Sequence, residues 1–146
     1  MSNGEKVRVL VVDDHMALRQ GLTHLVNSEP DLEVVGEASE GRAAVELSHQ
    51  LRPDVVIMDV CMPGMGGVEA TRAIHSALPH VQVIGVSMFE EADGGDAMRQ
   101  AGAVNYLNKQ DLCDSLIPAI RACRPCTAVL NSAASQSGKA TGRNED

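Results

Sequence analysis

The feature that most constrains the fold is a regular alternation of short Val-rich runs with longer amphipathic segments. Five nearly continuous apolar runs have the pattern of buried strands, at 7–12, 31–38, 55–59, 81–87 and 103–108. Five segments carry apolar residues at helical spacing, at 15–26, 39–51, 67–78, 90–101 and 111–123. Strict alternation requires crossover connections, which place helices on both faces of a parallel sheet. The sequence therefore predicts a doubly wound α/β fold with five parallel strands in the order 2-1-3-4-5.

Local signals refine three of the predicted helices. Ser39 precedes the second helical segment and is a plausible N-cap. Gly94 and Gly95 weaken the fourth, since each costs about 1 kcal/mol relative to Ala. In the fifth, Cys113 is in register with the apolar face, and Pro118 either kinks the helix or lies in a first turn that begins near Ser115.

Composition excludes several classes of protein. With one Phe, one Tyr and no Trp, the core must be built from Val, Leu, Ile, Ala and Met, and pockets that stack flat rings are disfavoured. The net charge of −8 repels phosphate backbones, so we expect no direct nucleic-acid binding by this chain. No apolar run reaches membrane-spanning length and no secretory signal is visible, which makes the cytoplasm the expected location and a membrane partner unexpected.

The last part of the chain differs from the rest. Residues 125–146 are small and polar without sustained periodicity, so we expect one domain over 1–124 followed by a flexible tail. The motif "CRPC" at 123–126 has redox spacing, but it falls at the end of a helix rather than at the N-terminus that would activate a thiol. Ordinary reduced cysteines are the simpler interpretation.

Polar residues follow the ends of four predicted strands. They are Asp13 and Asp14 after the first, Asp59 at the end of the third, Ser87 at the end of the fourth and Lys109 after the fifth. Ligands of open α/β sheets bind beyond the carboxyl ends of the strands, where the strand order reverses. Three carboxylates at one edge repel one another, and a divalent cation with a preference for oxygen, such as Mg²⁺, relieves that repulsion. Acids, Mg²⁺, a hydroxyl and a lysine together indicate phosphoryl chemistry on a carboxylate.

These residues resemble a known family, the receiver domain of two-component response regulators. The resemblance covers residues 6 to 123 and rests on four motifs in order, namely "VVDDH" at 11–15, "DVCMPGMGG" at 59–67, "VS" at 86–87 and "GAVNYLNK" at 102–109. The sequence around these motifs is most similar to the branch that carries a LuxR-type helix-turn-helix. The tail is too short for that output domain, which leaves a single-domain regulator, the receiver of a hybrid kinase, or a piece of a longer protein.

The resemblance implies a role for each acid. Asp59 would be the phosphoacceptor, taking a phosphoryl group from the phosphohistidine of a histidine kinase or phosphotransfer protein. Asp14 and Asp59 would bind Mg²⁺ directly together with the backbone carbonyl of Cys61, and Asp13 would act through water. Such a chain is a signalling domain with weak autophosphotransfer and autodephosphorylation, not a turnover enzyme.

The resemblance also implies how the signal leaves the site. Lys109 would pair with the phosphoryl oxygens and Ser87 would hydrogen-bond to the phosphoryl group. Tyr106 would then turn inward and change the surface formed by the fourth helix, fifth strand and fifth helix, through which phosphorylation would favour a homodimer.

Four positions depart from the family pattern. Gln110 replaces a frequent proline after the lysine, and Gly66 replaces the usual Asp or Asn before Gly67. Cys61 and Phe89 occupy positions that border the phosphoryl group and are often polar. Neither side chain orients an attacking water well, so we expect slow self-dephosphorylation.

Two other functions fit parts of the pattern. A haloacid-dehalogenase-like phosphatase also uses an aspartyl nucleophile and Mg²⁺, but it needs a second acid two residues later, where this chain has Cys61. A degenerate receiver that acts as an interaction module without phosphate is the other alternative, and the complete set of Asp, Ser and Lys counts against it.

Overall fold

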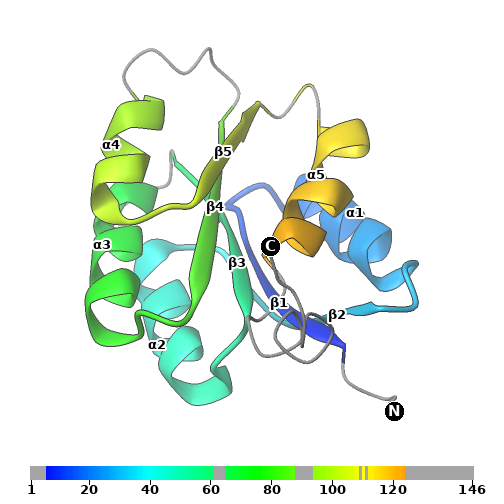
Figure 1. Cartoon of the computed structure of the whole chain (residues 1–146), viewed down its shortest axis with the longest axis horizontal. Helices are drawn as coiled ribbons and strands as arrows, with labels where there is room; N and C mark the ends of the chain where they lie inside the picture. The colour runs from blue at the N-terminus through cyan, green and yellow to red at the C-terminus, as the bar shows by residue number, and fades with distance from the viewer. Residues whose placement is uncertain (1–5, 61–64, 88–93, 109, 111, 124–146) are drawn as a thin grey trace, which may run out of the picture.

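The fold is a single parallel sheet between two layers of helices (Figure 1). The structure, a computed structural model, describes residues 6–60, 65–87, 94–108, 110 and 112–123. The strands are β1 (Val7–Val12), β2 (Leu32–Ala38), β3 (Val55–Asp59), β4 (Gln82–Ser87) and β5 (Asn105–Asn108). The helices are α1 (Met16–Asn27), α2 (Gly41–Leu51), α3 (Gly67–Ala77), α4 (Gly94–Ala101) and α5 (Leu112–Ala122). The predicted alternation and the predicted strand order β2-β1-β3-β4-β5 are both confirmed, with every neighbouring pair parallel.

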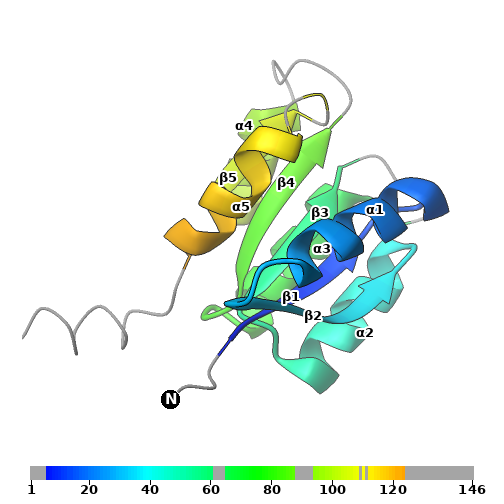
Figure 2. The same cartoon turned by 90° about the vertical axis from the view of Figure 1, so that its right-hand side faces the viewer.

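The sheet divides the core into two clusters. Helices α1 and α5 cover one face, and Figure 2 shows them lying side by side in front of the strands. Helices α2, α3 and α4 cover the other face. Every residue of β3 is buried because both faces of the central strand are covered, as its continuous apolar run predicts. Within the described residues, the fully buried apolar side chains are aliphatic, Met or Cys, which agrees with the predicted composition of the core.

Two local predictions are wrong, and for Pro118 the structure decides between the two predicted positions. Helix α2 begins at Gly41 with Glu40 as its N-cap, and no side chain caps it, so Ser39 lies one position too early. Cys113 is exposed, and Leu112 takes its place on the buried face of α5. Because α5 begins at Leu112, Pro118 lies in the helix interior and not in a first turn. There it removes the hydrogen bond that an N–H would donate to the carbonyl of residue 114.

The C-terminal end of α5 shows the environment of Cys123, the first cysteine of the "CRPC" motif. Cys123 follows the helix and its side chain is buried, and this burial raises the pKa of its thiol. A raised pKa lowers the fraction of reactive thiolate, which supports the interpretation of Cys123 as a structural residue. Cys126, the other cysteine of the "CRPC" motif, lies outside the described residues.

In the described part of the chain, no helix combines the length and the apolar character needed to cross a bilayer.

Candidate functional site

The carboxyl ends of β1 and β3 bring two buried acids together. Val12 pairs with Met58, so the next step along both strands places Asp13 beside Asp59. Both residues are buried, with Asp13 0% and Asp59 2% exposed. A buried carboxylate is costly unless charges or hydrogen bonds compensate it, so two of them at one sheet edge mark a site that attracts positive charge.

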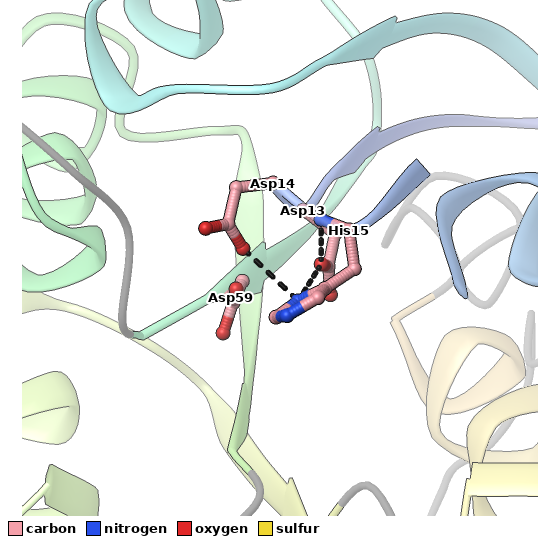
Figure 3. Close-up of side chains that lie close together, drawn as sticks. All are labelled: Asp13, Asp14, His15 and Asp59. Carbon is pink, nitrogen blue, oxygen red and sulfur yellow. Dashed lines mark hydrogen bonds and ion pairs between the residues drawn. The ribbon is translucent and has the colours of Figure 1, made fainter. Parts of the chain in front are cut away.

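Asp14 and His15 complete a compact cluster with these two acids. Each of the four side chains offers one oxygen or nitrogen atom, and these four atoms all lie within 4.8 Å of one another (Figure 3). The Asp14 side chain is 29% exposed, so the cluster opens to solvent on that side. The predicted convergence of Asp13, Asp14 and Asp59 is therefore what the structure shows.

Hydrogen bonds from the start of α1 hold Asp13 in place. Its Oδ1 accepts a hydrogen bond from the backbone N–H of His15 at 2.8 Å. Its carbonyl oxygen accepts one from Nη1 of Arg19 at 2.7 Å, and Arg19 Nε also pairs with Glu37 Oε1 at 3.1 Å. Asp13 is thus held in place by hydrogen bonds to both its carboxylate and its backbone carbonyl.

The other predicted site residues lie on β4 and β5 or beyond the described residues. Asp59 pairs with Val86, and the next residue along β4 is Ser87, which is buried at the same edge of the sheet. Tyr106 pairs with Gly85 and packs, half-buried, against the cluster of α2, α3 and α4. Lys109, Cys61 and Phe89 lie outside the described residues.

The donor set of this cluster fits a magnesium ion. Three carboxylates supply hard oxygen atoms, two from buried strand ends and one from a more open position. Mg²⁺ binds one or two protein carboxylates and keeps several waters, so a cluster that is closed on one side and open on the other suits it. Asp13, Asp14 and Asp59 are the described residues that would hold the ion.

His15 is the member of the cluster that the sequence prediction did not include. The His15 side chain is 67% exposed, as expected of a residue in a loop before a helix. Its Nδ1 nevertheless lies 3.1 Å from Asp14 Oδ1 and 3.3 Å from Asp13 Oδ1. The available signal was its position directly after two strand-end acids and directly before a helix, where a short turn brings neighbouring side chains to one point.

Comparisons with known proteins agree with this geometry. The family model described as the response regulator receiver domain matches residues 9–121. The response regulator GacA of Pseudomonas aeruginosa is 42% identical over 115 residues, which cover 79% of this chain and 54% of GacA. This chain spans about half the length of the curated relatives it matches.

Two solved structures extend the likeness to three dimensions. The receiver domain of the putative response regulator NarL from Mycobacterium tuberculosis superposes with a TM-score of 0.78 at 35% identity, covering 82% of this chain and 96% of that domain. A LuxR-family two-component response regulator from Aurantimonas superposes with a TM-score of 0.77 at 33% identity, covering 81% and 84%. These relatives confirm the predicted LuxR-associated branch. The chain belongs to the response regulator receiver domain family of two-component signalling.

Proposed function

We propose that Asp59 is the phosphoacceptor of this receiver domain and that the phosphoryl donor is the phosphohistidine of a histidine kinase or phosphotransfer protein. The observation that carries the proposal is the burial of Asp59 at the end of β3, with Asp13 and Asp14 close enough to share one cation. An Oδ atom of Asp59 forms a bond to phosphorus, and the bond from phosphorus to the imidazole nitrogen of the donor breaks. The electron pair of the broken bond stays on the imidazole nitrogen of the donor. A proton from solvent then leaves the donor histidine neutral.

The residues of the site divide the work of this transfer. Asp14, Asp59 and the Cys61 carbonyl would hold Mg²⁺, and Asp13 would hold one of its waters. The bound ion would neutralise charge on the phosphoryl oxygens, which is the main need of phosphoryl transfer. Lys109 would pair with a phosphoryl oxygen, and Ser87 would donate a hydrogen bond to another.

The response to phosphorylation would be a changed protein surface. Tyr106 lies on β5 next to Gly85 of β4, and Met98 of α4 borders the same glycine. Inward rotation of Tyr106 would alter the surface formed by α4, β5 and α5, and a homodimer would form through that surface. Such a domain would switch between protein partners and would not turn over a substrate. It would work in the cytoplasm, where histidine kinases present their phosphohistidine. Its folded part would end near residue 124.

Intact mass after incubation with acetyl phosphate and Mg²⁺ tests the assignment of Asp59. We expect one phosphoryl adduct on the natural protein and none on Asp59→Asn, because the amide cannot form an acyl phosphate. Asp114→Asn is the matched control, since Asp114 is an exposed carboxylate in the first turn of α5 and should keep the adduct. An adduct that persists in Asp59→Asn would contradict the assignment, and no adduct from any donor would favour the phosphate-independent interaction module.

The lifetime of the adduct gives a second prediction. Cys61 and Phe89 occupy the positions that border the phosphoryl group in the family, and neither side chain would orient an attacking water there. Phe89→His supplies a side chain that can, so we expect faster loss of the phosphoryl group from that variant, by about 100-fold, the lower end of what a positioned general base contributes. The decay of the adduct by intact mass, after removal of acetyl phosphate, measures it. A natural protein that decays as fast as Phe89→His would contradict the prediction.

A further inference from the structure

His15 is the side chain of the acidic cluster to which the proposed function gives no role. Its ring could extend into solvent, because about two thirds of the side chain is exposed. Figure 3 shows the ring turned toward the carboxylates of Asp13 and Asp14 instead. The local chain explains part of this orientation, since the backbone N–H of His15 is already bound to Asp13 Oδ1.

The start of α1 leaves the ring available at this place. His15 is the N-cap residue of α1 and has an extended backbone, with φ −93° and ψ 108°. Its carbonyl accepts the first helical hydrogen bond, from the N–H of Arg19 at 2.9 Å, but its side chain makes no capping hydrogen bond. The helix therefore fixes where the residue lies without using its imidazole.

The distances within the cluster are those of neighbouring ligands around one metal ion. Six ligands about 2.1 Å from an ion stand about 3 Å from their neighbours and about 4.2 Å from the ligand opposite. His15 Nδ1 lies 3.1 Å from Asp14 Oδ1 and 3.3 Å from Asp13 Oδ1. The four ligand atoms, with Asp59 included, all fall within 4.8 Å of one another. His15 Nδ1 and the oxygens of Asp14 and Asp59 are therefore close enough to share one ion, with Asp13 holding one of its waters.

We propose that His15 is a nitrogen ligand of the cation site and makes it bind borderline divalent ions, such as Co²⁺ and Ni²⁺, better than its oxygen ligands alone would. The inference rests on the proposed function, because it concerns the same cation site. Imidazole nitrogen suits first-row transition metals, whereas Mg²⁺ prefers oxygen and keeps its waters. The ring would therefore set the preference among metals and leave Mg²⁺ binding nearly unchanged.

Calorimetric titration with Co²⁺ and with Mg²⁺ tests this difference, at about pH 8 where an ordinary imidazole is neutral. We expect His15→Ala to weaken Co²⁺ binding about tenfold or more, as loss of a metal-site partner does, and to change Mg²⁺ binding less than about twofold. His24→Ala is the matched control, since His24 is an exposed histidine in the last turn of the same helix, and it should leave both affinities unchanged.

Proton NMR of the Co²⁺-loaded protein provides a readout that does not depend on affinity. Coordination through Nδ1 leaves the Nε2–H of His15 close to a paramagnetic ion, so a strongly shifted, exchangeable resonance is expected in the natural protein. It should be present in His24→Ala and absent from His15→Ala. Its persistence in His15→Ala would overturn the proposal.

The affinities separate failure of this inference from failure of the proposed function. If His15→Ala weakens both metals equally, the ring acts by holding the carboxylates and is not a ligand. If the same variant strengthens Mg²⁺ binding and leaves Co²⁺ binding unchanged, the ring competes with the cation. Either result overturns the role of His15 and leaves the phosphoacceptor untouched. If Asp14→Asn alters neither metal, the cation site itself is wrong and both proposals fail.

Discussion

Gly67→Ala is expected to destabilise the protein by about 3 kcal/mol, a loss of the size that overpacking against fixed backbone atoms produces. Gly67 begins α3, and its N–H donates a hydrogen bond to the carbonyl of Val60 at 3.0 Å. A Cβ at this position would overlap the carbonyl oxygen of Asp59 and lie 2.8 Å from the Cα of Val60. These are backbone atoms, so the end of β3 would have to move to make room. The same movement would shift the Asp59 carboxylate, and we expect slower phosphorylation by acetyl phosphate.

Urea unfolding of Gly67→Ala and Gly66→Ala measures this effect against a matched control. Gly66 is the preceding residue, its φ of −76° is open to any amino acid, and a Cβ there would meet only the Val60 carbonyl oxygen at 3.7 Å. We therefore expect Gly66→Ala to cost less than about 1 kcal/mol, the ordinary difference between N-cap residues. Equal losses from the two variants would show that close packing against β3 is not the cause.

Gly102→Ala should cost a similar amount, about 3 kcal/mol, from two separate sources. The residue lies between α4 and β5 with φ 120°, a conformation that costs other residues about 1 to 3 kcal/mol. An added Cβ would also overlap the His75 side chain of α3, at its Cβ, Cγ and Cδ2 atoms. The glycine therefore allows both the chain reversal and the close approach of α3.

A double variant separates the two sources. His75 is an exposed residue, so His75→Ala alone should change the free energy of unfolding by less than about 1 kcal/mol. In Gly102→Ala/His75→Ala the overlap is gone and only the backbone strain remains, so about half of the loss should be recovered. Gly21→Ala is the reference for an unstrained glycine, because nothing lies within 4 Å of its added Cβ, and it should stabilise α1 by up to about 1 kcal/mol. If the double variant recovers nothing, the contact with His75 does not contribute to the loss.

The parts of the site that lie on strands were predictable from the sequence. A continuous apolar run can only be buried between two layers, and a parallel sheet puts all strand ends of one kind at one edge. Asp13, Asp59 and Ser87 follow such runs directly, so their common edge was determined by chain order. The strand register, which puts Asp13 beside Asp59, is the step that required coordinates.

The parts that depend on single side-chain orientations were not predictable. His15 and Ser39 both lie in short turns before a helix, where one residue of shift decides what a side chain contacts. His15 turned toward the acids although its exposure resembles that of a surface residue, and Ser39 lies one position before the true N-cap. Cys113 and Leu112 are neighbours with similar apolar character, so periodicity alone could not choose which of them faces the core.

The position of Tyr106 makes the domain its own optical reporter. The chain has one tyrosine and no tryptophan, so all tyrosine emission comes from this ring. The ring lies at the junction of β4 and β5, where a Cβ on Gly85 would come within 3.0 Å of its Cδ1. A change in the polarity or quenching of the ring therefore reports events at this junction alone, in unlabelled protein and in real time.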